Sequence, residues 1–391
     1  MRPLVSQEKV RKGCIMSSEY HWDYVDLRIR EKLEGYGEGT FSLESRLTFS
    51  CYQHAVVLPY KKGCCEGGVI DREGVFVKNT TVHEELQDGL YPIDDDEVRC
   101  IDNDVIFIGD LYSVYGHAIT DNLKKIWFLK TKEAQEVLAK GGELIYITFH
   151  GQELAPFVFR LFELAGVDIS KAHHITAPTR FRQVIVPDNS LVLDGHRRYF
   201  AEEFRQAIEV IKNNAGKKKY PTYDKVYFFR TAIHQRRDYG EKNVEKAFRR
   251  HGYYIIHPEQ LPLEHQIQLA ANCKEFVATM GSVSHTSIFC TESSRIILLL
   301  KSNYSNGYQT MINDFAHADV TLIDTNHSLP LEFPWSGPFY MSYTKHLAKF
   351  FSCRHCDIYF FDSQWYQYLW RYLQTEVVSK LRRLKYQLTR R

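Results

Sequence analysis

A histidine and a carboxylate stand four residues apart where a predicted strand gives way to a helix. The apolar run VIFIGD (105–110) predicts a buried strand, and the chain then reaches His117 and Asp121. Residues at i and i+4 share one face of a helix, so these two side chains can meet. A histidine beside a carboxylate can take a proton from an attacking hydroxyl near neutral pH. The pair is therefore a candidate general base, and a capping or buried structural pair is the alternative interpretation.

A second set of candidates gathers where the predicted strands of the C-terminal half end. They follow these strands or lie within a helical turn or a short loop of them: Arg230, Arg236, His257, Gly281, Ser282, His285 and Lys301. Gly281 permits close backbone approach, and a helix beginning near Ser282 directs free N–H groups to the same point. Guanidinium and ammonium groups supply the charge that a diphosphate requires. The pattern predicts a phosphate site, with solvated loop cations and a packed histidine as the alternative.

A parallel α/β unit must position this second set. From about residue 225, five short β-branched or aromatic runs alternate with four segments of helical spacing. The runs are 225–229, 253–256, 275–279, 295–300 and 320–323, and the helical segments are 241–251, 263–272, 283–291 and 308–318. Strands and helices that alternate over short connections predict a doubly wound parallel sheet, in which ligands bind beyond the carboxyl ends of the strands.

The middle third of the chain repeats the alternation more loosely. Strands are predicted at 105–108, 144–148 and 183–187, and helices at 117–139, 152–165 and 199–213. The charged, Gly- and Pro-containing segment 213–221 predicts a domain boundary. We therefore expect an α/β fold with an N-terminal α/β domain over 1–215, whose first 100 residues are irregular and strand-rich. A C-terminal Rossmann-like domain over 220–340 follows, and then helices over 341–391 that pack back on the N-terminal domain or on a membrane surface.

Composition excludes several classes of protein. The 391 residues are 44% apolar and 25% charged, which is typical of a globular chain. The net charge of +2 is too even for a nucleic-acid binder that relies on bulk electrostatics. No apolar run approaches the roughly 20 residues that cross a bilayer, and the basic N-terminal segment lacks the apolar core of a secretory signal. We expect a cytoplasmic protein with reduced cysteines, without a Walker loop or a G-x-G-x-x-G motif.

Three groups raise the question of a metal ion. Cys353 and Cys356 have the two-residue gap of zinc and redox sites, but the nearest further cysteines are distant in the sequence. The acidic clusters 94–97 and 102–104 precede their predicted strands, whereas a carboxylate pair that holds a nucleotide-bound cation usually follows one. We therefore expect packing cysteines, surface turns and no catalytic metal.

The C-terminal residues predict one long amphipathic helix. Leucine or valine recurs every three or four positions from Leu369 to Leu388, and residues 371–391 carry seven Lys or Arg and one Glu. One interpretation is a helix that packs back on the protein with its basic face in solvent. The other is a helix that also lies on anionic lipid, for which the nearby Trp365 and Trp370 are suited.

Several segments resemble the family 61 glycosyltransferases, the DUF563 group, and in particular its bacterial members linked to capsular and lipopolysaccharide synthesis. They cover roughly residues 65–350 and include VIFIGDLYSVYGHAITDNLKKIWFL, the run from KVYFFR to SHTSIFC, YQTMINDFAHADVTLID and GPFYMSYTKHLAKF. The matching positions are the Gly116-His117 helix start, Arg230, the stretch around Gln266 and the Gly281-Ser282 turn. The family often has Glu where this chain has Asp121.

The resemblance implies a GT-B arrangement, in which two Rossmann-like domains face each other across a cleft. It further implies a metal-independent, inverting glycosyltransferase that uses a nucleotide sugar as co-substrate and no other cofactor. His117 or Asp121 would then take the acceptor proton, with Tyr115 and Gly116 on the acceptor side. The implied donor-binding residues are Arg230, Arg236, His257, Gln266, Gly281, Ser282, His285 and Lys301.

The acceptor implied by the resemblance is a hydroxyl of a cell-surface polysaccharide or of a lipid-linked glycan. The basic C-terminal helix would then hold the enzyme at the inner face of the plasma membrane, and no nucleic-acid partner is expected. Two alternatives remain open from the sequence. One is a nucleotide-sugar epimerase, which needs no acceptor, and the other is a non-catalytic binding or assembly subunit of a polysaccharide complex.

Overall fold

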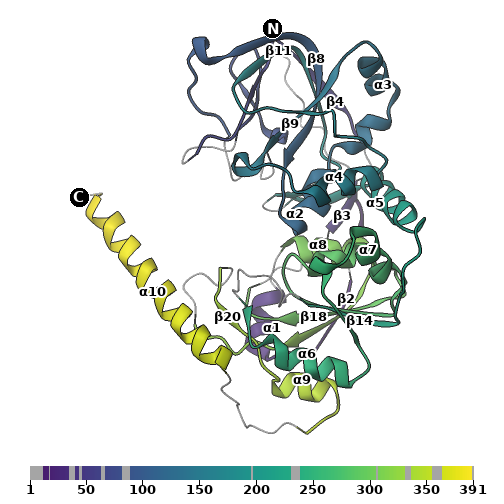
Figure 1. Cartoon of the computed structure of the whole chain (residues 1–391), viewed down its shortest axis with the longest axis vertical. Helices are drawn as coiled ribbons and strands as arrows, with labels where there is room; N and C mark the ends of the chain where they lie inside the picture. The colour runs from purple at the N-terminus through teal and green to yellow at the C-terminus, as the bar shows by residue number, and fades with distance from the viewer. Residues whose placement is uncertain are drawn as a thin grey trace. The chain divides into compact units, whose positions relative to one another are not determined.

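The chain forms two compact units in the computed structural model. Unit 1 comprises residues 1–17 and 39–219, and unit 2 comprises residues 18–38 and 220–391. The structure describes residues 12–16, 18–34, 40–43, 46–62, 67–81, 89–194, 197–229, 238–304, 307–330, 336–354 and 363–389. Each unit has its own sheets (Figure 1). Each also has its own hydrophobic core.

Unit 2 is built on a six-stranded sheet in which every pair of strands is parallel. Its order is β16 (Tyr254–Ile256), β14 (Lys225–Phe228), β17 (Glu275–Thr279), β18 (Arg295–Leu300), β19 (Asp319–Asp324) and β2 (Glu19–Tyr24). The central strands read as continuous apolar runs because both of their faces are buried. All five strands predicted for this half are present. Numbered along the C-terminal half, they follow the flavodoxin-like order 2-1-3-4-5, and β2 extends the sheet beyond the fifth.

The helices of unit 2 match three of the four predicted segments. They are α6 (Glu241–Arg250), α7 (Leu263–Asn272) and α8 (Gly307–Ala316), joined by α1 (Leu27–Glu34) and α9 (Lys345–Phe350). The predicted helix at 283–291 is instead a six-residue 3-10 segment, η7 (Ser284–Phe289), and all of its residues are buried. Three hydroxyl-bearing residues lie in η7, and such side chains compete with the backbone for hydrogen bonds, which disfavours a regular α-helix.

Unit 1 departs from the predicted second Rossmann-like domain, because half of its sheet is antiparallel. The order is β10 (His173–His174), β9 (Glu143–Thr148), β8 (Arg99–Leu111), β11 (Thr179–Pro187), β5 (Val56–Leu58), β6 (Gly68–Ile70) and β7 (Phe76–Val77), and β4 (Phe49–Gln53) also pairs with β11. The strands from β10 to β11 are parallel, and the remaining pairs are antiparallel. The short strands within 49–77 need only hairpin-length connections, which parallel pairing does not allow.

Two helices predicted for unit 1 also have different limits. The expected helix at 117–139 is divided into α2 (Tyr115–Thr120), the 3-10 turns η3 (Asp121–Leu123) and η4 (Ile126–Lys130), and α3 (Lys132–Ala139). Thr131 starts α3 anew, since its side chain accepts a hydrogen bond from the backbone N–H of Ala134. The helix α5 (Glu202–Ala215) begins after residue 199, because β13 (Arg197–Ala201) joins β12 (Leu191–Asp194), β3 (Thr40–Leu43) and β1 (Lys12–Met16) in a second sheet. The helix α4 (Pro156–Leu164) falls within its predicted range.

In the part of the chain that the structure describes, the C-terminal helices contact strands of unit 2. Helix α9 packs on β19 and β2, and α10 (Ser363–Thr389) contacts β15 (Asp238–Tyr239) and β20 (Phe339–Tyr340). Tyr368 of α10 is fully buried among aromatic rings, and Tyr372 donates a hydrogen bond to the carbonyl of Pro330 (2.7 Å). Within the described residues, no helix combines the length and the apolar character needed to span a bilayer.

Candidate functional site

The turn after β8 holds the first candidate site. The side chain of Asn122, which is fully buried, accepts a hydrogen bond from the backbone N–H of Tyr112 (2.8 Å) and donates one to its carbonyl (3.0 Å). These two hydrogen bonds fix the path of the chain from the strand into α2. Tyr115 and Gly116 form the start of that helix, and His117 and Asp121 follow at its end.

Asp121 lies at the centre of a charged triad. Its carboxylate is fully buried, with one oxygen 2.6 Å from His117 Nδ1 and the other 2.5 Å from Lys124 Nζ. Burial by itself raises the pKa of Asp121, but Lys124 and the hydrogen bond with His117 outweigh burial and hold the pKa well below its ordinary value. The carboxylate is therefore ionised at neutral pH, and it is held by His117, by Lys124 and by a hydrogen bond from the hydroxyl of Thr120 (3.3 Å).

The triad orients the imidazole of His117. A hydrogen bond from Nδ1–H to an ionised carboxylate leaves the lone pair on Nε2, and the side chain is 33% exposed. The ring of Tyr112 stacks on the imidazole at a centroid distance of 4.9 Å. The arrangement can accept a proton at Nε2, and the buried Asp121 then stabilises the imidazolium that forms.

The second candidate site lies at the carboxyl edge of the unit 2 sheet. Gly281, which follows β17, has φ +146°, a region that favours glycine, and its N–H donates to the side-chain oxygen of Ser284 (3.1 Å). Ser284 in turn donates to Gln309 (2.5 Å) of α8, so the turn is anchored to the helix. Because η7 is a short 3-10 segment, its dipole is weaker than that of the α-helix expected beyond Ser282.

Lys301, at the end of β18, reaches the same turn. A Cβ on Gly281 would lie 3.8 Å from Lys301 Nζ. The ammonium is paired with both carboxylate oxygens of Asp238, at 3.0 and 3.1 Å, and lies over the ring of Phe339. The predicted phosphate-binding cation therefore has an acidic partner of its own in this structure, which sequence reasoning did not identify.

A buried acid lies beside this ion pair. Glu241, the first residue of α6, is 2% exposed and accepts hydrogen bonds from Thr279 (2.8 Å) and Tyr227 (3.1 Å). Burial and the neighbouring Asp238 raise the pKa of Glu241 to about 7, although Thr279, Lys301 and Tyr227 oppose the rise. The edge of the sheet thus holds two carboxyl groups close to one ammonium.

Three further predicted donor-site residues have structural contacts. The side-chain amide of Gln266 donates to the carbonyls of Pro258 and Leu261 (2.8 and 3.0 Å), so it holds the turn that precedes α7. His257 follows β16 as expected, with Nδ1 3.8 Å from the carboxylate of Glu259. His285 is 4% exposed within η7 and packs near Tyr308.

The remaining predicted positions are two arginines, two cysteines and the two acidic clusters. Arg230, Arg236 and Cys356 lie outside the described residues, whereas Cys353 is exposed. The acidic turn at 94–97 contains the expected surface turn, η2 (Asp95–Glu97). Residues 102–104 lie inside β8 instead of before it, where Asp104 pairs with Arg182 of β11 (2.8 Å), so the expectation of a turn there is wrong.

The two units together define a mixed α/β protein that contains a doubly wound parallel sheet and an oriented carboxylate–histidine pair. Residues 115–297, a little under half of the chain, match the family model described as Glycosyltransferase 61. The matched region begins at the first residue of α2 and ends within β18, so it contains the His117–Asp121 pair and the Gly281 turn. The match confirms the resemblance to the family 61 glycosyltransferases, without the narrower likeness to the bacterial capsular members, and indicates a glycosyltransferase. No match to a curated protein was found.

Proposed function

We propose that this chain is an inverting glycosyltransferase that transfers a sugar from a nucleoside diphosphate sugar to a hydroxyl of a surface glycan. The observation that carries the proposal is the oriented His117–Asp121–Lys124 triad, which lies at the start of the matched region. Unit 2 binds the donor at the carboxyl edge of its sheet, and unit 1 presents the acceptor.

His117 is the general base in this proposal, and Asp121 positions it. The acceptor hydroxyl oxygen bonds to the anomeric carbon on the face opposite the nucleotide, and the bond from that carbon to the phosphate oxygen breaks. The hydroxyl proton passes to His117 Nε2, and the nucleoside diphosphate leaves with the electron pair of the broken bond. Lys301 and the Gly281 turn stabilise the leaving diphosphate, so the chain needs no metal ion for this step. Asp121 is a poor base because Lys124 stabilises its ionised form.

Variants of two histidines in unit 1 test this assignment. The wild-type protein is incubated with a panel of nucleotide sugars and glycan acceptors, and released nucleoside diphosphate and the glycoside product are measured. We expect His117→Ala to lower kcat by about 10²- to 10⁴-fold with little change in donor KM. His173→Ala is the matched control, since His173 also lies in unit 1, is exposed and faces a carboxylate, that of Glu143 at 3.5 Å.

The outcomes separate the alternatives that the sequence left open. Equal rates for His117→Ala and wild type would refute the role of His117. Conversion of the donor without any acceptor would identify an epimerase instead. A donor that is neither bound nor consumed, together with a stable partner complex, would identify a non-catalytic assembly subunit.

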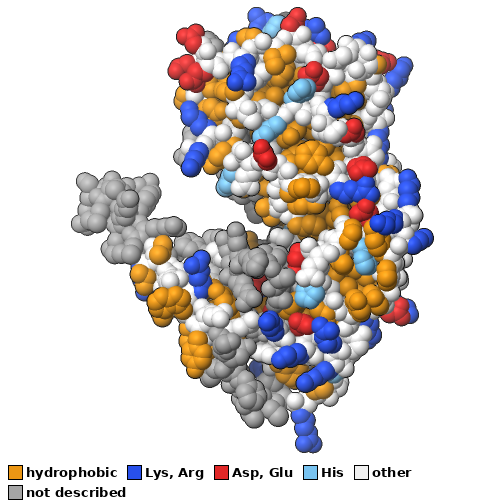
Figure 2. All heavy atoms as spheres, in the orientation of Figure 1, with side chains coloured by type: hydrophobic (Ala, Val, Ile, Leu, Met, Phe, Trp, Pro, Cys, Tyr) orange, Lys and Arg blue, Asp and Glu red, His pale blue; other side chains and the backbone are white. Residues whose placement is uncertain are grey.

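We further propose that the protein binds the cytoplasmic face of an anionic membrane, where lipid-linked acceptors lie. Helix α10 supports this part of the proposal. Its outward side carries a stripe of exposed apolar side chains, which Figure 2 shows in part. They are Tyr366 (67% exposed), Trp370 (66%), Leu373 (56%), Val377 (54%) and Val378 (45%). The seven basic residues among 371–391 would repel a second copy of this helix and attract anionic headgroups.

Vesicle binding tests the role of α10. We expect the wild type to sediment with phosphatidylglycerol vesicles more than with phosphatidylcholine vesicles, and less at high salt. Trp370→Ser combined with Leu373→Ser should abolish most of this binding. Leu27→Ser, which changes an equally exposed leucine (68%) on α1, is the control and should bind as wild type does. Equal binding by both variants would refute a lipid-binding α10.

A further inference from the structure

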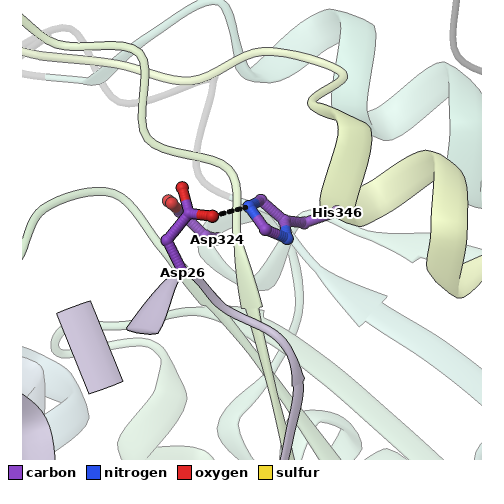
Figure 3. Close-up of side chains that lie close together, drawn as sticks. All are labelled: Asp26, Asp324 and His346. Carbon is purple, nitrogen blue, oxygen red and sulfur yellow. Dashed lines mark ion pairs between the residues drawn. The ribbon is translucent and has the colours of Figure 1, made fainter. Parts of the chain in front are cut away.

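Three side chains with metal-ligating atoms meet at the carboxyl ends of β19 and β2. Asp324 is the last residue of β19, Asp26 follows β2, and His346 lies in α9 (Figure 3). One ligand atom from each lies within 4.8 Å of the ligand atoms of the other two. These residues come from three distant parts of the sequence, and neither the proposed proton transfer nor the proposed donor site uses them.

The backbone holds the three side chains in place. β19 and β2 pair in parallel with Ile323 opposite Tyr24, so the residues that follow them leave the sheet side by side. The side chain of Thr344 caps α9 by accepting a hydrogen bond from the N–H of Leu347 and donates one to the carbonyl of Asp324 (2.5 Å). The helix that carries His346 is therefore tied to the strand that carries Asp324.

The polar atoms in this cluster are only partly satisfied by one another. Asp324 is 6% exposed, accepts a hydrogen bond from the N–H of Asn326 (2.9 Å), and has a pKa raised chiefly by burial. The Nε2 atom of His346 is buried and pairs with a carboxylate oxygen of Asp26 at 3.3 Å. An imidazole nitrogen and two carboxylates therefore converge on one small region, where a bound cation would replace the ion pair between His346 and Asp26.

We propose that Asp26, Asp324 and His346 form a binding site for a divalent transition-metal ion such as zinc or manganese. One imidazole nitrogen and two carboxylate oxygens are a common ligand set for these ions, with bonds of about 2.0 to 2.2 Å. Ligand atoms bound to one such ion lie about 3 to 4.4 Å apart, and the three ligand atoms here lie within 4.8 Å of one another, so only small side-chain movements are needed to bind an ion. The ion joins the N-terminal segment to the sheet of unit 2 and thereby stabilises the fold.

Lys345 is the group that opposes metal binding. Its Nζ lies 3.2 Å from the Asp26 oxygen that also faces His346, but its side chain is 65% exposed and can turn into solvent. A metal ion would compete with this ammonium for Asp26. Removal of Lys345 should therefore strengthen metal binding, whereas a purely structural ion-pair cluster would only lose a contact.

Calorimetric titration of the tag-free full chain with Zn²⁺, and separately with Mn²⁺, tests the site after the protein has been treated with a chelator. We expect one site per chain and a metal-dependent rise in melting temperature. Asp26→Asn and Asp324→Asn should weaken binding at least tenfold, and Lys345→Ala should strengthen it. The control is His21→Ala in β2, since His21 also faces a carboxylate, that of Asp319 at 2.9 Å, and this variant should leave metal binding unchanged.

Two results would overturn the site. One is equal metal affinity in the wild type and in Asp26→Asn, a variant of a half-exposed residue (53%) that does not threaten the core. The other is weaker metal binding in Lys345→Ala, which would mean that the cluster is an ion-pair network. These measurements do not depend on enzymatic activity, so they stand apart from the test of His117.

Discussion

Glu241 provides the sharpest test of the electrostatics at the edge of the unit 2 sheet. The Glu241→Gln substitution keeps an oxygen that can accept the hydrogen bonds from Thr279 and Tyr227, and it removes the ionisable group. Any difference in pH dependence between this variant and the wild type therefore reports the charge of Glu241.

The sign and the size of the effect follow from the raised pKa. The pKa of Glu241 is 4.5 in its ordinary state and about 7 in the fold, so the folded state binds more protons than the unfolded state between these values. The stabilisation from the neutral form is complete below pH 4.5 and is lost as the pH rises through 7. The loss amounts to about 3 kcal/mol, which corresponds to about 6 to 12 °C in melting temperature for a unit of this size.

Differential scanning calorimetry of both proteins between pH 4.5 and 8.5 measures this difference. The two units can melt separately, and the transition that shifts on substitution belongs to unit 2. We expect equal melting temperatures near pH 4.5 and an increasing advantage for Glu241→Gln as the pH rises to 8. Parallel pH profiles would refute the raised pKa. A variant less stable than wild type at pH 8 would show that an ionised Glu241 pairs favourably with Lys301.

Three further substitutions test the surroundings of Lys301. Asp238→Asn should free the ammonium and tighten pyrophosphate binding about tenfold by calorimetric titration, whereas unchanged binding would contradict a phosphate role for Lys301. Gly281→Ala should cost about 1 to 3 kcal/mol in urea unfolding because of the positive φ, since the added Cβ itself has room beside Lys301. Gln309→Leu should cost about 2 to 5 kcal/mol by the same assay, because Ser284, Ser287 and Asn313 would all lose a buried partner; a loss below 0.5 kcal/mol would refute the network.

Most strands of unit 2 could be predicted because the apolar composition of each short run is enough to indicate a buried strand. A run such as Arg295–Leu300 is apolar at nearly every position, and a strand covered on both faces needs that composition. β2 could not be predicted in the same way. Its residues EYHWDY alternate polar and aromatic types, and its partner β19 lies about 300 residues away, so neither its pairing nor its register is encoded nearby.

The helix boundaries that sequence reasoning missed have a different cause. Helical spacing of apolar residues continues through residues 117–139. This spacing carries no information on the hydrogen bonds from polar side chains to the backbone that interrupt a helix. The side chain of Thr120 bonds to the carbonyl of Gly116, and Thr131 caps a new helix, so the segment is divided where polar side chains take over backbone partners. The spacing of apolar residues is the same on either side of these breaks.

The first candidate site was accessible to sequence reasoning because it is local. His117 and Asp121 are four residues apart, and Lys124 is a further three along, a spacing that also predicts contact on a helix face. The carboxylates of the second site were not accessible. Asp238 is 63 residues from Lys301, and the two meet because β15, which pairs with β20 outside the main sheet, lies beside the end of β18.

Asp238 and Glu241, the acidic neighbours of Lys301, affect how a diphosphate would bind at this edge of the sheet. An isolated lysine offers its charge to any phosphate, whereas Lys301 must exchange Asp238 for the incoming oxygen atoms. That exchange leaves Asp238 without its cation, beside Glu241 and near the phosphates, and like charges at this distance repel. Protonation of Glu241 relieves part of this repulsion, and its pKa of about 7 makes the proton available at neutral pH. Donor binding at this edge should therefore take up a proton, and its affinity should fall as the pH rises above 7.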